Sequence, residues 1–284
     1  MTVPAVSAAR KMIPRSVSDR LGWLGAAIVA VLLIAAVFAP LIAPYDPTER
    51  VARPFLPPSA EHPLGTNDVG QDLLSELIFG ARVSLTVGIV AALVAMLIGT
   101  SVGIIAGYYP KRAGAVLMRF VDVVLILPFL PLLIVLAAYL GRSLTNTIVV
   151  IGVLIWAGPA RIIRSQVLSL RSREYVLASR SMGARDRWVI MRHILPRTAL
   201  LATGSFVRAI SGAILLEAAL SFLGLGDPIQ KSWGSILFWA QSRGAFLTPA
   251  WKWWVLPPGL AIMAASLGFA LIAFAVEERI NPKL

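Results

Sequence analysis

The sequence predicts an all-α integral membrane protein with about six transmembrane helices, and three observations support this fold class. Apolar residues make up 58% of the 284-residue chain and charged residues only 14%, whereas about a quarter of the residues in soluble domains are charged. Apolar runs long enough to cross a bilayer, which takes roughly 20 residues in a helix, recur along the chain. The basic residues gather in the segments between alternate runs, as they do in multi-pass proteins.

The apolar runs define the expected spans. The first run follows a polar segment, residues 1–20, and is too long for the core of a cleaved signal peptide, so we interpret it as an uncleaved anchor. Prolines interrupt the third, fourth and sixth runs, which membrane bundles tolerate where neighbouring helices satisfy the freed backbone groups. Residues 21–284 then form one transmembrane domain. The expected spans are residues 21–43, 83–107, 114–139, 146–166, 199–224 and 253–276.

The distribution of arginine and lysine sets the orientation. Basic residues are most frequent in residues 1–20 and 162–198, so we expect these segments and both chain ends in the cytoplasm. The outer side then receives a long loop, residues 44–82. It also receives a tryptophan group expected to form an aromatic belt at the outer membrane surface: Trp233, Trp239, Trp251, Trp253 and Trp254.

Composition excludes several function classes. The net charge of +12 lies mostly between apolar runs rather than on one water-facing surface, so nucleic-acid binding is not expected. The chain has no cysteine and no Gly-x-x-x-x-Gly-Lys-Ser/Thr phosphate loop, so ATP and magnesium, if used, bind partner subunits. No catalytic set or metal cluster is found. His62 is expected to form hydrogen bonds in a loop and His193 to pack in the inner loop.

The inner loop, residues 162–198, is too long to be a simple connector. Ser172 is a candidate cap for a short helix, which Gly183 is expected to break. Apolar residues recur at helical spacing among the arginines. Two interpretations remain open from the residues alone: a helix lying on anionic lipid, or a helix that docks on a protein partner. The two apolar stripes are Tyr175, Ala178 and Met182, then Trp188, Met191 and Leu195.

Three motifs carry a resemblance. Leu177-Ala178-Ser179, Gly183 and Leu195-Pro196 have the spacing of the EAA motif of ABC importer permeases, although Leu177 replaces its glutamate and His193 its isoleucine. Residues 62–85 and 220–234 are similar to segments of the C-type inner-membrane permease of dipeptide, oligopeptide and nickel importers. Residues 20–284 therefore resemble this family, with departures at Ala270 and in residues 274–277.

The resemblance implies the type I ABC importer permease fold and a location in the bacterial inner membrane. It implies a second homologous permease, one or two cytoplasmic ABC ATPases and an external substrate-binding protein as partners. Peptide is the cargo implied first and nickel or a metal chelate second, and nothing in the sequence decides between them. The residues implied to couple to the ATPase are Tyr175, Leu177, Ala178, Ser179, Met182, Gly183, Arg185, Leu195 and Pro196.

Four charged residues fall within the expected spans. Arg119 and Asp122 are three residues apart on one helix and are expected to form a structural ion pair. Arg208 and Glu217 are too far apart to pair along one helix, so each needs a partner on another helix or a watery cavity, and both are candidates for the translocation path. A self-sufficient secondary transporter is the rival function, but we find no repeated halves to support it.

Overall fold

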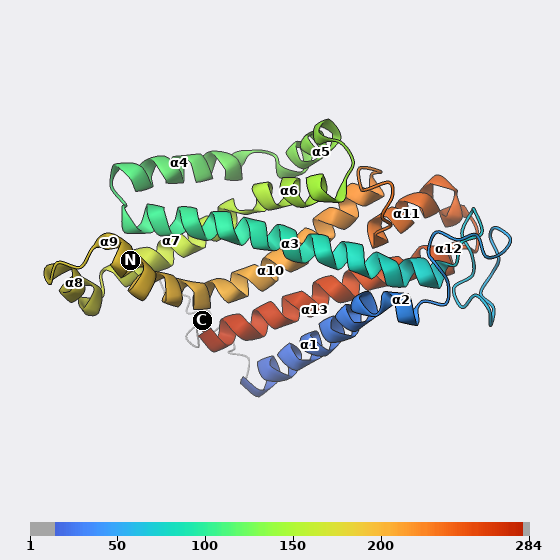
Figure 1. The fold of residues 1–284 in the computed structure, drawn as a ribbon, viewed down its shortest axis with the longest axis horizontal. Helices are drawn as coiled ribbons and strands as arrows, with labels where there is room; N and C mark the ends of the chain where they lie inside the picture. The colour runs from blue at the N-terminus through green and yellow to red at the C-terminus, as the bar shows by residue number, and fades with distance from the viewer. Residues whose placement is uncertain (1–14, 281–284) are drawn as a thin grey trace, which may run out of the picture.

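The computed structural model describes residues 15–280 and forms an elongated bundle of helices (Figure 1). The polar segment before residue 15 and the motif residues Asn281 and Pro282 lie outside the described residues. Within residues 15–280 there is no strand, and one isolated bridge joins Thr66 to Asp72. The elements are α1 (Arg15–Val37), α2 (Ala39–Ile42), α3 (Leu73–Tyr108), α4 (Arg112–Ile126), α5 (Phe129–Leu140), α6 (Leu144–Ile155), α7 (Ala157–Arg171), α8 (Glu174–Ser181), α9 (Asp186–Val189), the π-helix η1 (Ile190–Ile194), α10 (Leu195–Phe222), α11 (Trp233–Ser242), the 3-10 helix η2 (Ala245–Leu247), α12 (Trp251–Trp254) and α13 (Leu256–Ile280).

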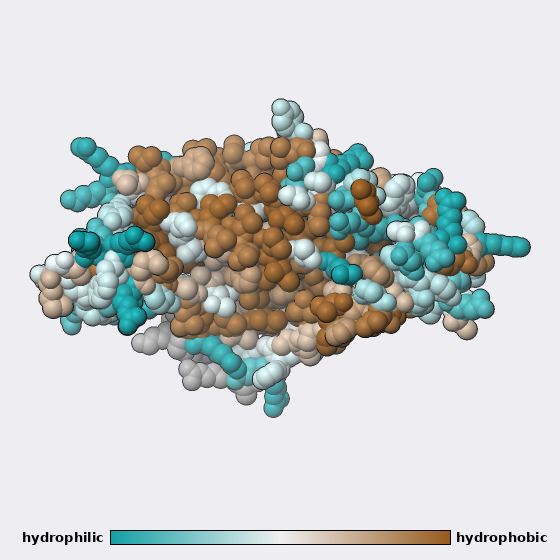
Figure 2. All heavy atoms as spheres, viewed as in Figure 1, coloured by the Kyte–Doolittle hydropathy of each residue, from teal (hydrophilic) through white to brown (hydrophobic). Residues whose placement is uncertain are grey.

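Four helical segments are long and apolar enough to cross a membrane: Val17–Val37, Leu73–Tyr108, Asp186–Phe222 and Trp251–Ile280. Two bent helix pairs, α4 with α5 and α6 with α7, bring the number to six if each pair is one span. On the face that Figure 2 shows, apolar side chains form a brown band across the middle of the molecule, with polar side chains gathered at both ends. The chain is therefore a multi-pass membrane protein, as predicted.

The two polar ends are built differently. One end carries α8 and α9, and we call it the α8 end (Figure 1). The opposite end carries α2, α12 and the irregular segment before α3, and we call it the α12 end. The long helix α3 runs from the α12 end to the α8 end, so it links both surfaces.

The sequence predicted that the second span begins at residue 83, but the helix begins ten residues earlier. Asp72 caps α3, because its carboxylate accepts hydrogen bonds from the backbone N–H of Ser75 at 2.8 Å and from its hydroxyl at 2.8 Å. The helix therefore starts at Leu73, and the expected loop at residues 44–82 is shorter than predicted. The start of this helix was predicted too late because the residues before 83 resemble a loop in composition, although Asp72 caps a helix there.

The third and fourth spans are broken rather than continuous. Residue Leu127 is extended before Pro128, and α5 leaves α4 at 89°. Proline disfavours helical backbone at the residue before it and removes an N–H from the helix. The pair α6–α7 bends by 42° close to Pro159. The prolines noted in the sequence are thus the points where these spans bend.

The expected inner loop is also mostly helical. Helix α7 continues to Arg171, and α8, α9, η1 and α10 follow, so only short connections within residues 162–198 lack helical structure. The span that was expected from residue 199 is continuous with this region, because the helical path from Asp186 runs through η1 into α10. The loop is therefore an extension of two transmembrane helices.

Small residues allow the closest helix packing in the bundle. Gly103 of α3 faces α7 so closely that a Cβ atom there would lie 2.8 Å from the carbonyl oxygen of Ala160. Gly99 and Gly107 lie on the same face, one turn before and one turn after, and are equally crowded by α7. Packing of this kind, with small residues four apart, is typical of membrane helix interfaces.

The expected tryptophan belt is only partly present. Trp233 and Trp254 are each 1% exposed and anchor the core at the α12 end, whereas Trp239 and Trp251 are 40% and 43% exposed. The Nε1 atom of Trp233 donates a 2.9 Å hydrogen bond to the carbonyl oxygen of Leu77. Two of the tryptophans therefore serve tertiary packing, which their clustering in the sequence did not reveal.

Candidate functional site

The α8 end projects a compact helical loop beyond the bundle (Figure 1). Helix α8 begins after Arg173, which is extended and supplies no side-chain cap. Ser172, the predicted cap, instead donates its hydroxyl to the carbonyl oxygen of Ser169 at 3.0 Å and so ends α7. Glu174 lies in the first turn of α8, where its negative charge stabilises the helix dipole.

Gly183 ends α8, as predicted. Its φ of +84° is a left-handed conformation that side chains with a Cβ rarely adopt. The N–H of Gly183 donates to the carbonyl oxygen of Arg180 at 3.0 Å, and the N–H of Ala184 donates to that of Ser179 at 3.0 Å. This turn sends the chain back toward the bundle and into α9.

The predicted stripe Tyr175, Ala178 and Met182 is not a single exposed face, which corrects the sequence interpretation. Tyr175 is half-buried, and its ring packs against His193 with the guanidinium of Arg197 4.4 Å from its centroid. Ala178 is exposed and Met182 is 81% exposed. Helix α8 turns a different face toward the bundle.

That inward face is formed by Val176 and Ser179. Val176 is fully buried, and Ser179 donates its hydroxyl to the carbonyl oxygen of Tyr175 at 2.8 Å. His193 Nε2 lies 3.3 Å from the same hydroxyl, so His193 packs inside the loop as predicted. Leu195 is half-buried against the same core, whereas Arg185 and Pro196 are exposed.

The apolar residues that remain exposed belong to both short helices and η1. They are 49% to 81% exposed, which is unusual for large apolar side chains at a polar end of the molecule. We call them the exposed apolar set: Leu177, Met182, Trp188 and Met191.

A tyrosine pair fastens this loop to α3. Tyr108 donates its hydroxyl to Asp186 Oδ1 at 2.8 Å, and Tyr109 donates to Asp186 Oδ2 at 3.1 Å. Arg180 lies over the Tyr108 ring, 5.6 Å from its centroid. Burial, followed by the bond to Asp186, raises the pKa of Tyr109, so the phenol stays a donor at neutral pH. Sequence analysis missed this contact, although an aspartate among so many arginines was a signal.

The charged residues within the spans find partners on other helices. Asp122 of α4 pairs with Arg161 of α7 at 2.6 Å, not with Arg119, which corrects the predicted pair. A partner on the adjacent α7 holds the two helices together, whereas a pair within α4 would not. Arg208 of α10 pairs with Glu277 of α13, so the requirement for a partner on another helix was correct.

Glu217 is 2% exposed and lies inside the bundle, among α3, α10 and α11. It accepts hydrogen bonds from the Ser84 hydroxyl at 3.0 Å and the Ser221 hydroxyl at 2.7 Å. The backbone N–H of Trp233 in turn donates to Ser84 Oγ at 3.2 Å. Glu217 therefore links α3 and α10 through hydrogen bonds, so it has the partner on another helix that the sequence required. Its role in the translocation path stays a prediction.

Polar contacts hold the irregular segment of the α12 end in place. His62 Nδ1 lies 3.0 Å from Asp72 Oδ1, so His62 forms a loop hydrogen bond as predicted. Arg243 pairs with Asp68 at 2.8 Å. Lys231 binds both Glu76 and Gln71, and so connects the loop after α10 to the start of α3. Among residues 15–280, no group of three potential metal ligands is found.

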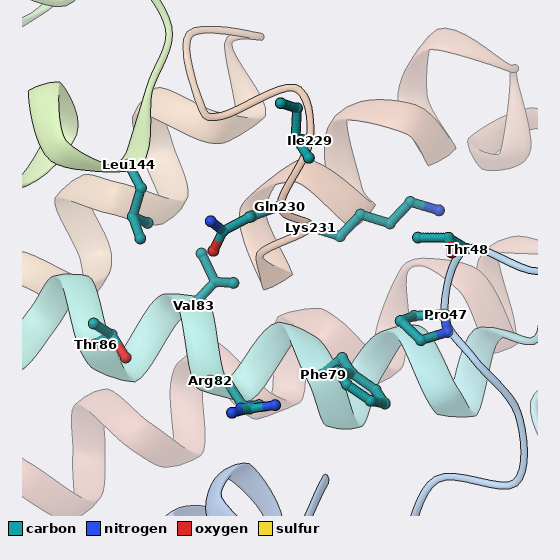
Figure 3. Close-up of a pocket in the computed structure, with 10 residues that line it drawn as sticks. All are labelled: Pro47, Thr48, Phe79, Arg82, Val83, Thr86, Leu144, Ile229, Gln230 and Lys231. Carbon is teal, nitrogen blue, oxygen red and sulfur yellow. The ribbon is translucent and has the colours of Figure 1, made fainter. Parts of the chain in front are cut away.

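A pocket of about 470 Å³ opens beside these contacts (Figure 3). One wall is a face of α3, and the opposite wall is the loop between α10 and α11. The start of α6 and the segment before α3 complete it. The lining residues are Pro47, Thr48, Phe79, Arg82, Val83, Thr86, Leu144, Ile229, Gln230 and Lys231.

Comparison with known proteins agrees with this architecture. Residues 99–284 match the family described as binding-protein-dependent transport system inner membrane component, and residues 10–58 match the N-terminal transmembrane domain of oligopeptide transport permease C. The dipeptide transport system permease protein DppC of Alkalihalophilus pseudofirmus is 35% identical over 99% of this chain and 91% of its own length.

Two further relatives cover the chain almost completely. The di/tripeptide transport system permease protein DppC of Pseudomonas aeruginosa is 38% identical over 95% of this chain and 91% of its own length. The oligopeptide transport system permease protein OppC of Bacillus subtilis is 33% identical over 94% of this chain and 87% of its own length. The chain therefore belongs to the family of binding-protein-dependent transport system inner membrane components and is a permease of the DppC and OppC type.

Proposed function

We propose that this chain is the transmembrane subunit of an ABC importer for peptides and forms half of the translocation path. Relatives named as dipeptide, di/tripeptide and oligopeptide permeases match it over nearly its full length, and this observation carries the proposal. A second, related permease would supply the other half of the path. ATP and magnesium would bind ATPase subunits that contact the α8 end.

The helical loop between α7 and α10, which we call the α8 loop, supports the contact with an ATPase. Its exposed apolar set gives a partner a surface to cover, and Arg180 and Arg185 are exposed beside it. The buried face of α8 and the tyrosine contacts to Asp186 attach the loop to the bundle, so a force applied to α8 reaches α3. Such rigid attachment suits alternating access driven by movement of whole helices.

This proposal places the α8 end and both chain ends in the cytoplasm of a bacterium and the α12 end outside the inner membrane. The basic residues favour that orientation, because Arg171, Arg173, Arg180, Arg185 and Arg187 all lie at the α8 end. An external binding protein would then deliver peptide to the α12 end.

A pulldown of the tagged chain from its native membranes, in mild detergent, tests the proposal. Mass spectrometry should identify a second permease, one or two ATPases and a peptide-binding protein among the co-purifying proteins. A binding protein loaded with nickel or a metal chelate would replace the peptide assignment. Recovery of the chain alone would contradict the importer and favour a self-sufficient transporter.

A further inference from the structure

The pocket at the α12 end has one uncompensated positive charge. Lys231 is bound to Glu76 and Gln71, so its charge is already neutralised. Arg82 is exposed, and within residues 15–280 it has no hydrogen-bond or ion-pair partner. None of the residues that line the pocket is acidic. The pocket therefore attracts an anionic group and repels a cationic one.

Arg82 is held in a suitable position for a ligand. Phe79, Arg82, Val83 and Thr86 recur along α3 at spacings of three and four, so they share one face of the helix. The guanidinium carbon of Arg82 lies 6.0 Å from the centroid of the Phe79 ring, within the range of cation–π attraction. A guanidinium positioned in this way keeps its N–H groups free to form a bidentate contact with a carboxylate.

The remaining walls indicate what accompanies the carboxylate. Val83, Leu144 and Ile229 are apolar, while Thr86 and Gln230 supply a hydroxyl and an amide (Figure 3). The volume of about 470 Å³ is within the range of small-ligand pockets, about 300 to 1,000 Å³. A carboxylate next to an apolar side chain is the chemistry of the last residue of a peptide.

We propose that this pocket binds the C-terminal residue of an entering peptide, with Arg82 holding its carboxylate and Phe79, Val83 and Ile229 contacting its side chain. The proposal rests on the peptide function proposed above and assigns this chain a specific role in recognising cargo. The side chain of an internal glutamate or aspartate has the same carboxylate chemistry, so the test must separate the two sources.

The absence of cysteine makes the test specific for this chain. The variant Arg82→Cys, assembled with cysteine-free partners in proteoliposomes, introduces one thiol that methanethiosulfonate reagents can modify. We expect uptake of a tripeptide ending in phenylalanine to fall about tenfold, as loss of one charged hydrogen-bond partner predicts. An aminoethyl reagent, which returns a positive charge, should restore at least half of the uptake, whereas a sulfonatoethyl or methyl reagent should not.

Protection against modification then identifies the bound group without the binding protein. In nanodiscs, the variant Thr86→Cys keeps Arg82 and places an exposed thiol in the pocket lining. The tripeptide with a free C-terminus should slow modification of this thiol several-fold. The C-terminal amide of the tripeptide should not do so, with or without a glutamate in the middle position. Protection by the amide that carries glutamate would overturn the C-terminal assignment, and equal rates with every peptide would overturn the pocket as a binding site.

The variant Arg50→Cys is a matched control, because Arg50 is exposed at the same end and does not line the pocket. It should keep wild-type uptake with every reagent. If both arginine variants respond equally to the reagents, the charge acts on docking of a partner and the proposal is wrong. If the wild-type complex imports no peptide, the proposed function itself fails, and this result is distinct from normal peptide uptake by Arg82→Cys.

Discussion

The hydroxyl of Tyr108, at the last residue of α3, donates a 2.8 Å hydrogen bond to Asp186, at the first residue of α9. Tyr109 donates to the other carboxylate oxygen at 3.1 Å. Both oxygens of one carboxylate are therefore held at the C-terminal end of α3, and the same helix carries Arg82 nearer its N-terminal end. Movement of the α8 loop and movement of the pocket wall are consequently linked through one continuous helix, α3 (Figure 1).

The double variant Tyr108→Phe with Tyr109→Phe should insert and assemble normally but lose coupling. Only two hydroxyl groups are removed, and each hydrogen bond to a charged acceptor contributes about 1.5–3 kcal/mol. We expect substrate-stimulated ATP hydrolysis by the reconstituted complex to fall several-fold. Tyr139→Phe is the control, because Tyr139 is 87% exposed on α5. Stimulation at the wild-type level in the double variant would show that the tyrosines do not transmit the motion.

Gly183→Glu should leave membrane insertion intact and abolish substrate-stimulated ATP hydrolysis. No atom lies within 4 Å of the position that a Cβ would occupy, so no clash is expected, but the φ of +84° strains any side chain. Gly244→Glu is a matched control at the α12 end, since Gly244 has a φ of +72° and equally open surroundings. Normal transport by Gly183→Glu would contradict the role of the loop in coupling.

Glu217→Ala should destabilise the isolated chain by about 2–4 kcal/mol, because it leaves a cavity and unpaired hydroxyls on Ser84 and Ser221. Glu217→Gln keeps the volume and one acceptor, so we expect a loss nearer 1 kcal/mol. Thermal unfolding in detergent measures both. Transport selectivity of correctly assembled Glu217→Gln should match the wild type if the role of Glu217 is structural, and altered selectivity would support its predicted place in the translocation path.

Reversal of the Asp122–Arg161 pair distinguishes it from the pair predicted within α4. Asp122→Asn should lower thermal stability because it leaves the Arg161 charge without its partner between two candidate membrane spans. The charge reversal Asp122→Arg with Arg161→Asp should recover most of the loss. Arg119→Gln should have little effect, since Arg119 is exposed and does not bind Asp122. A larger loss from Arg119→Gln than from Asp122→Asn would favour the intrahelical pair.

Several features of the site followed from local sequence. The break at Gly183 and the loop hydrogen bond of His62 were predicted because each depends on residues within about ten positions in the sequence. The need of Arg208 for a distant partner followed from its place inside an apolar helix, although the sequence did not identify Glu277. The exposed apolar set was only partly predicted, because which face of α8 turns inward depends on the bundle beneath it.

Other features were accessible only from the structure. The pocket joins residues of α3, α6 and two loops that are far apart in the chain. The contacts of Asp186 with Tyr108 and Tyr109 likewise depend on how α3 and α9 are placed. No periodicity within one segment contains this information, since the periodicity of a helix indicates a face but not what covers it.

The sequence by itself determined that the chain is a helical membrane protein with about six spans, because a bilayer requires long apolar helices whatever their neighbours are. Its motifs also identified the family. The tertiary structure decided the partners of Asp122, the burial of Glu217, the inward face of α8 and the single unpaired guanidinium in the pocket lining, that of Arg82. The physical reason is that charge pairing, burial and pocket shape depend on distances between helices, which only their packing sets.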